Sequence, residues 1–239
     1  MMPDAAQLYA VTEATWPPAA RSTCGPFIIR DGQGGGKRVS AATVEGAFDA
    51  ADIDRAEDAM RQLGQDPLFM IRQDDTALDQ ALDARGYDVV DPVVLYVLPI
   101  EKLTDKPIPR VTAFTIWEPL AIMREMWAQG GVGPARIEVM SRANTKTAIL
   151  ARWDEKPGGV AYAGLHEGTC MVHAVEVPVH QRRKGVAQWI MRCAAFWGQS
   201  QGATHVAVLC VTANVGANAL YRSLGFTPVG GYHYRHLSE

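Results

Sequence analysis

The sequence of 239 residues predicts an α/β protein with a mixed sheet, arranged as two successive halves. Strand-like apolar runs alternate with amphipathic helical segments along the chain. The clearest group is a strand at 169–177, a long helix from Val186 and a buried strand at 205–211. A strand, a crossover helix and a second strand in this order form a right-handed unit with parallel strands. The polar, proline-containing segment 103–109 is expected to link the two halves.

The first half, residues 1–102, is expected to have the element order α-β-β-α-β-α-β. Its predicted elements are a helix at 4–15, a hairpin of strands at 27–31 and 37–44, a helix at 52–63, a strand at 68–72, a helix at 76–86 and a strand at 87–100. The glycine-rich run 32–36 could be taken for a phosphate loop. However, Asp31 and Arg38 stand where a Walker A loop needs Gly and Ser or Thr, so we interpret the run as a hairpin turn.

The second half, residues 110–239, is expected to contain the longer series of elements. They are a strand at 111–117, two short helices within 119–143, a hairpin of strands at 147–153 and 159–165, the strand, helix and strand named above, a short helix after Asn214 and a final hairpin at 226–236. The long helix is strongly indicated, because its apolar residues fall 3, 1, 3, 1 and 3 positions apart, on one face of a 3.6-residue period.

Composition and charge argue against several classes of partner. The formal net charge is −3 and the Lys and Arg residues are scattered, so we expect no nucleic acid and no membrane surface. The N-terminus lacks an export signal, and the longest apolar run, 93–100, is too short to span a bilayer, which favours a cytoplasmic location. The four cysteines form no C-x-x-C pair and no metal-ligand spacing with the histidines, so we expect no metal.

Residues 181–187, Q-R-R-K-G-V-A, connect the strand to the long helix. A diphosphate is bound well by free backbone N–H groups at a helix start, where the helix dipole is positive and no side chain intrudes. Gly185 and Ala187 keep the backbone open here. The residues that add positive charge are Arg182, Arg183 and Lys184. The segment therefore predicts a diphosphate-binding loop, with an ordinary basic loop before a helix as the alternative.

Two motifs resemble those of the GCN5-related N-acetyltransferases (GNAT). The phosphate loop of that family reads [QR]-x-x-G-x-[GA], which Arg182, Gly185 and Ala187 match. A later helix of the family resembles V-x-x-x-N-x-x-A-x-x-L-Y-x-x-x-G-F, and this chain has V-T-A-N-V-G-A-N-A-L-Y-R-S-L-G-F at 211–226, with one spacing difference at its first valine. The resemblance implies the GNAT acyl-CoA N-acyltransferase fold, acetyl-CoA as cosubstrate and transfer of the acetyl group to an amine by direct attack.

The resemblance also implies where the cosubstrate is held. In the family the central strand ends at a bulge and separates from its neighbour, so backbone groups near Val175 and Val177 are expected to bond the pantetheine amides. Two valines in an ordinary buried strand are the alternative. The loop from Arg182 to Ala187, with Val186 in the first helical turn, would hold the diphosphate. Asn214 is expected at the pantetheine arm, with a role as helix cap as the alternative.

The catalytic groups implied by the resemblance are a tyrosine and a base. Tyr221 is expected to donate a proton or hydrogen bond to the departing thiolate, with a core aromatic as the alternative. His173 lies nine residues before Arg182, where the family member serotonin N-acetyltransferase has a histidine, and it is favoured as the base. Glu176 is the rival, and a chain of waters is a further alternative. Strand alternation places Glu176 on the opposite face from His173, so at most one should face the cosubstrate.

The first half is expected to be a degenerate GNAT-like domain that buttresses the second. Its element order is similar, but Glu45, Asp49 and Asp52 at the corresponding helix start would repel a diphosphate. The acceptor is expected to be a small-molecule amine or a peptide amine, and a homodimer stays open. A non-catalytic module that binds or senses acyl-CoA on the same fold is the alternative function.

Overall fold

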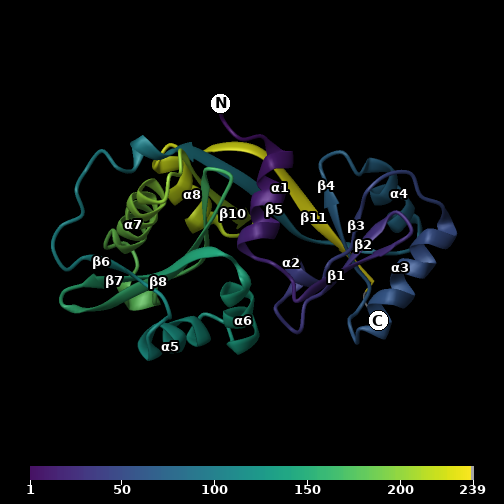
Figure 1. Cartoon of the computed structure of the whole chain (residues 1–239), viewed down its shortest axis with the longest axis horizontal. Coiled ribbons are helices and arrows are strands. Elements are labelled where there is room, and N and C mark those ends of the chain that lie inside the picture. Colours follow the sequence, from purple (N-terminus) through teal and green to yellow (C-terminus); the bar gives the residue numbers. More distant parts are fainter. Residues whose placement is uncertain (238–239) are drawn as a thin grey trace. The chain divides into compact units, whose positions relative to one another are not determined.

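The computed structural model describes residues 1–237, which form two compact units (Figure 1). Unit 1 comprises Met1–Pro17, Leu95–Cys210 and Asn214–Val229, and unit 2 comprises Pro18–Val94, Val211–Ala213 and the chain from Gly230. This division differs from the predicted one at 103–109. The first 17 residues and the end of the long strand before the linker belong with the second half, whereas the last strand ends in unit 2.

The N-terminal helix explains part of this difference. Helix α1 (Ala5–Thr15) packs against β8 and β9 of unit 1. The Thr12 hydroxyl lies 3.3 Å from the sulfur of Met171, and a Cβ on Gly164 would lie 2.7 Å from Cβ of Thr15. Sequence position alone assigned α1 to the first half, but its buried face completes unit 1. The role of unit 2 as a degenerate GNAT-like copy stays a prediction.

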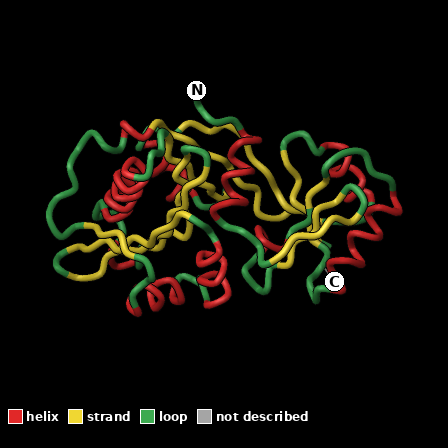
Figure 2. The backbone as a smooth tube through the Cα atoms, in the orientation of Figure 1, coloured by secondary structure: helices red, strands yellow, loops and turns green. Residues whose placement is uncertain are grey.

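Unit 1 contains a mixed sheet with helices on both faces. Its elements after α1 are the end of β5 (Asp88–Pro99), β6 (Ala113–Ile116), α5 (Ala121–Gln129), α6 (Pro134–Arg142), β7 (Thr145–Trp153), β8 (Lys156–His166), β9 (Thr169–Glu176), α7 (Val186–Ser200), β10 (His205–Val211), α8 (Val215–Ser223) and the start of β11 (Thr227–His236). The sheet runs β5-β10-β9-β8-β7-β6, and β9 and β10 are parallel around α7, as predicted. Helix α7 connects these two strands along the chain, and Figure 2 shows it as a continuous helix in red.

The two faces of the unit 1 sheet are covered by different helices. A Cβ on Gly159 of β8 would lie 2.9 Å from Ile190 of α7. A Cβ on Gly164, an odd number of residues further along the same strand, would lie 2.7 Å from Thr15 of α1. Helix α5 also contacts β8 and β9. Side chains alternate along each strand, so one face is covered by α7 and the other by α1 and α5.

Unit 2 is built on a smaller antiparallel sheet. Its elements are β1 (Ala20–Cys24), β2 (Phe27–Asp31), α2 (Lys37–Ser40), β3 (Thr43–Val44), α3 (Ala50–Gln62), β4 (Leu68–Arg72), α4 (Thr76–Ala84), the start of β5 and the end of β11. Strands β1, β2 and β3 form one sheet, and β4 pairs with β11. At the start of α3, Asp49 and Asp52 hydrogen-bond each other's backbone N–H groups, so this helix start is capped by its own carboxylates.

One predicted hairpin is right only in part, and another is wrong. The predicted pairing of strands at 27–31 and 37–44 holds only at residues 43–44, where β3 pairs antiparallel with β2, because residues 37–40 form a helical turn. The first hairpin of the chain pairs β1 with β2. Strand β1 is polar and exposed, so it carries none of the apolar alternation that marks a strand. The predicted hairpin at 226–236 is one long strand, β11. A Cβ on Gly231 would lie 2.6 Å from the carbonyl oxygen of Val93, so this glycine permits close approach of two backbones and makes no turn.

No helix within residues 1–237 combines the length and the apolar character that a membrane crossing requires.

Candidate active site

Strand β9 contains a bulge near its end. Its pairs with β8 join Tyr162 to His173 and Val160 to Glu176. One residue on β8 therefore lies between the paired positions, whereas two residues, Ala174 and Val175, lie between them on β9. Ala174, in the bulge, has a positive φ of 49°, which is uncommon for a residue other than glycine.

The bulge corrects the predicted alternation of side chains. Val160 and Tyr162 are two apart on β8 and share one face, so their partners Glu176 and His173 share that face as well. The prediction that these two side chains point to opposite faces is therefore wrong. The extra residue in the bulge shifts the alternation by one position, and both side chains lie on the face covered by α1 and α5.

Strands β9 and β10 pair only over the first part of their length. Within the described chain, their parallel ladder joins Thr169–Val172 to His205–Val208 and ends there, although β9 continues to Glu176 and β10 to Val211. The two strands thus part at the position where the resemblance implies it. Val175 and Val177 are half-buried beside this opening. Their bonds to a pantetheine arm stay a prediction.

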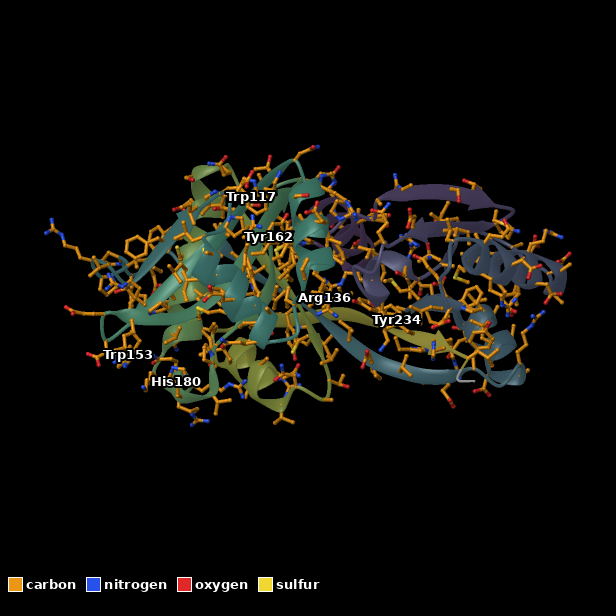
Figure 3. All side chains as sticks on the ribbon, turned by 90° about the horizontal axis from the view of Figure 1, so that it is seen from below. Trp117, Arg136, Trp153, Tyr162, His180 and Tyr234 are labelled. Carbon is orange, nitrogen blue, oxygen red and sulfur yellow. The ribbon has the colours of Figure 1, made fainter. Side chains whose placement is uncertain are left out.

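Glu176 lies half-buried at the end of β9. Its carboxyl group fits against the end of α5, where a Cβ on Gly130 would lie 2.5 Å from Cδ and 2.6 Å from Oε2. Burial raises the pKa of Glu176, while the positive charges of Arg182 and Arg136 lower it in part. Figure 3 marks Arg136. A carboxylate with a raised pKa is a better proton acceptor, so this environment suits a general base.

His173 is enclosed by the N-terminal segment. It is 4% exposed, and its ring lies 5.1 Å from that of Trp16 and 5.9 Å from that of Tyr162. Its Nε2 is 2.8 Å from the Thr15 hydroxyl, which donates its own proton to the carbonyl of Val11. A hydroxyl has one proton, so Nε2–H of His173 is the donor. This ring is packed and bonded as part of the core.

Tyr221 is buried on α8, at 5% exposure. Its ring packs against Tyr96 at 6.0 Å and Phe226 at 5.8 Å. Burial raises the pKa of Tyr221, and the negative charges that Cys210 and Glu176 can carry raise it further. The phenol therefore stays protonated at neutral pH. Both roles predicted for Tyr221, proton donor and core aromatic, agree with this position.

The predicted diphosphate loop has an open backbone. Arg183 and Gly185 have φ of 63° and 79°, and Gly185 caps the start of α7 without a side-chain hydrogen bond. Successive backbone N–H groups around left-handed residues form a concave site for anions. Arg182, Arg183 and Lys184 are exposed, and Lys184 Nζ lies 3.3 Å from Gln181 Oε1. Val186 is buried and Ala187 is half-buried, so they anchor the first turn of the helix.

Asn214 caps helix α8. Its Oδ1 accepts a hydrogen bond from the N–H of Ala217 at 3.0 Å, which is the alternative role that the sequence left open. Asn218 donates to the Asn214 carbonyl at 2.8 Å and accepts from the Tyr96 hydroxyl at 2.9 Å. This buried chain of hydrogen bonds fixes the helix that carries Tyr221. Contact between Asn214 and a pantetheine arm stays a prediction.

Sequence reasoning missed two residues that shape the site. Trp127 of α5 is fully buried, and its indole N–H donates to the carbonyl of Ala174 in the bulge at 2.8 Å. Gly130 provides the space for the Glu176 carboxyl group. A buried tryptophan and a glycine at a helix end both have ordinary structural explanations, so their types alone carry no signal of a site.

Comparison with known proteins agrees with this arrangement. The model of the Acetyltransferase (GNAT) family matches residues 115–226, which include the bulged strand, the open loop and α8. The chain contains a GNAT-family domain. This domain spans β6 to α8, lies within unit 1 apart from residues 211–213, and contains His173, Glu176 and Tyr221. The match to the GNAT family model supports an acyltransferase function for the protein.

Similar proteins match the chain over almost its whole length. The uncharacterized N-acetyltransferase YobR of Bacillus subtilis is 22% identical over 244 residues, which cover 98% of this chain and 99% of that protein. The structure of a GCN5-related N-acetyltransferase from Kribbella flavida matches with a TM-score of 0.70 at 19% identity, covering 98% of this chain and 96% of that one. A tandem GNAT protein from the clavulanic acid biosynthesis pathway matches with a TM-score of 0.60 at 13% identity, covering 97% and 87%. The predicted GNAT fold and mixed sheet are thus confirmed.

Proposed function

We propose that this protein transfers an acetyl group from acetyl-CoA to an amine. The observation that carries the proposal is the geometry at the end of β9. There the strand has parted from β10 beside an open, basic loop at the start of α7, and the half-buried Glu176 ends the strand. Glu176 on β9 and Tyr221 on α8 both lie within the segment that the family model matches, and burial raises the pKa of each. A proton acceptor for the amine and a proton donor for the departing thiolate are the two groups that direct aminolysis of a thioester uses.

The residues present fit coenzyme A. The left-handed backbone at Arg183 and Gly185, the start of α7 without a side-chain cap and three exposed basic side chains suit a diphosphate. The unpaired end of β9 suits an extended amide arm that bonds like an added strand. Bound there, acetyl-CoA would supply an activated thioester.

In the proposed reaction, Glu176 takes a proton from the attacking amine as the new C–N bond forms. Tyr221 donates its phenolic proton to the sulfur as the C–S bond breaks, so that acetylated amine and free thiol leave. We assign the base to Glu176 and not to His173. The burial of His173 and its bond to Thr15 favour a structural role, whereas Glu176 is half-buried with a raised pKa. The acceptor class remains a small-molecule or peptide amine, in a cytoplasmic protein.

Binding of the cosubstrate is tested by thermal unfolding with and without acetyl-CoA. A ligand at about a hundred times its dissociation constant adds roughly 2.7 kcal/mol to the free energy of unfolding. For a chain of this size this corresponds to a rise in melting temperature of about 5–10 °C. We expect Gly185→Val to abolish the rise, because the side chain strains a left-handed residue and fills the open loop.

The control is Gly202→Val, at the other end of the same helix. Gly202 has a φ of 87° and no neighbour within 4 Å of a Cβ, so this variant carries the same backbone strain away from the loop. Each variant is compared with its own melting temperature without ligand. A wild-type protein that shows no rise at millimolar acetyl-CoA, or a Gly185→Val variant that keeps the full rise, contradicts the proposed binding site.

A further inference from the structure

Helix α5 places two residues against the bulged end of β9. Trp127 donates its indole N–H to the carbonyl of Ala174, and Gly130 faces the Glu176 carboxyl group. Residues three apart lie on the same face of a helix, so one face of α5 makes both contacts. The two contacts act on different parts of the same strand end: one on the backbone of the bulge, the other on the side chain that follows it.

The Trp127 contact acts on the residue that makes the bulge. A left-handed conformation costs a residue other than glycine about 1–2 kcal/mol, so Ala174 needs compensating contacts. The indole hydrogen bond is one of them, and full burial of the Trp127 ring leaves it little freedom to move away. Without the bulge, simple alternation would turn Glu176 toward the face covered by α7. Trp127 thus helps to determine on which side of the sheet Glu176 lies.

The Gly130 contact acts on the carboxyl group itself. A Cβ at this position would overlap Cδ, Oε2 and Cγ of Glu176, at 2.5 to 2.8 Å. Gly130 has φ −85° and ψ 5°, which any residue adopts, so the helix end does not require glycine there. The absence of a side chain is needed for space. The end of the flexible Glu176 side chain occupies this space. A larger residue at position 130 would therefore move the carboxyl group and leave the backbone in place.

We propose that Trp127 and Gly130 are positioning residues that set the place of the Glu176 carboxylate in the active site. Trp127 stabilises the bulge that turns Glu176 toward α5, and Gly130 leaves the volume in which its carboxylate lies. This inference rests on the proposed function, because it concerns the group assigned there as the base. Helix α5 would then affect the reaction rate although none of its side chains takes part in the chemical step.

The first test is Gly130→Ala, compared with Gly133→Ala. Gly133 lies in the same loop with φ −82° and no neighbour within 4 Å of a Cβ, so the same substitution meets open space there. A displacement of about 1 Å at a catalytic group can slow a reaction about 10²-fold. We expect a loss of kcat of this order for Gly130→Ala, an unchanged affinity for acetyl-CoA, and near-normal kcat for Gly133→Ala.

The second test is Trp127→Phe, which keeps an aromatic ring in the core but removes the N–H donor. We expect a loss of kcat of about tenfold or more, with the acidic limb of the pH–rate profile displaced. In the double variant with Glu176→Gln, neither Trp127→Phe nor Gly130→Ala should lower kcat further, because both act through the same carboxylate. A merely structural role would give additive losses and an unmoved pH profile.

A readout independent of turnover is the titration of the Glu176 side-chain carboxyl followed by ¹³C NMR, with Glu176→Gln used to assign the signal. In the wild type the pKa is raised by burial. It should fall toward the ordinary value in Gly130→Ala, where the carboxyl is pushed toward solvent, and stay raised in Gly133→Ala. If Glu176→Gln keeps normal turnover, the proposed base is wrong. If Glu176→Gln is slow while Gly130→Ala and Trp127→Phe keep wild-type rates and titration, the positioning inference alone is overturned.

Discussion

Replacement of Glu176 by Gln should lower kcat for acetyl transfer about 10² to 10⁴-fold, with the affinity for acetyl-CoA nearly unchanged. The amide keeps the size of the side chain and its place against Gly130 but accepts no proton from the attacking amine. The measurement is the rate of thiol release at saturating acetyl-CoA, made for both proteins with one amine. His173→Gln serves as the matched control in the same strand and should mainly lower stability.

The pH–rate profile gives a second, independent test of the role of Glu176. A base acts only when deprotonated, so the rate should rise with pH through the pKa of Glu176. Burial raises that pKa, so the acidic limb of the wild-type profile should lie above the ordinary glutamate range. In Glu176→Gln this limb should be missing, leaving only the ionisation of the acceptor amine. A variant that retains both the rate and the limb would assign the base elsewhere.

Replacement of Tyr221 by Phe should slow the chemical step about 10² to 10³-fold, the loss seen when one preorganised donor to a developing anion is removed. The ring contacts with Tyr96 and Phe226 persist in phenylalanine, so folding should be preserved. Burial raises the pKa of Tyr221, which keeps the wild-type phenol protonated well above neutral pH. Single-turnover measurements with bound acetyl-CoA isolate this step.

The control for Tyr221→Phe is Tyr87→Phe, which removes the hydroxyl of a buried tyrosine in unit 2. This variant should turn over at nearly the wild-type rate. Equal single-turnover rates for Tyr221→Phe and the wild type would make Tyr221 a core aromatic only. In that case the thiolate would have to leave without a proton from this side chain.

Much of the fold could be predicted because its strongest elements bury one regular face. The 3.6-residue period of α7 and the apolar run of β10 give the parallel unit around them, and the motif at 211–226 gives α8. What failed has no such period. Strand β1 is exposed and polar, and the paired glycines of β11 lie inside a strand where two backbones approach. The unit to which α1 belongs depends on tertiary packing, which the local sequence pattern does not encode.

The site residues also fall into those that the sequence could predict and those that it could not. Gly185 and its basic neighbours could be identified because a motif fixes both residue types and spacing. The relation of His173 to Glu176 could not, because one bulged residue reverses the alternation that the inference used. Likewise, the contacts of Trp127 and Gly130 depend on where α5 lies against the sheet, which no local pattern in the sequence specifies.

Acetyl transfer to an amine is measured by incubating the protein with acetyl-CoA and a panel of small amines and peptides. Free thiol and acetylated amine are measured together by thiol titration and mass spectrometry, at a pH above the acidic limb. We expect at least one amine to yield both products in equal amounts, and Glu176→Gln to yield far less of each. Saturable binding of acetyl-CoA with no thiol and no acetylated product from any amine would contradict acetyl transfer and favour a module that only binds acyl-CoA.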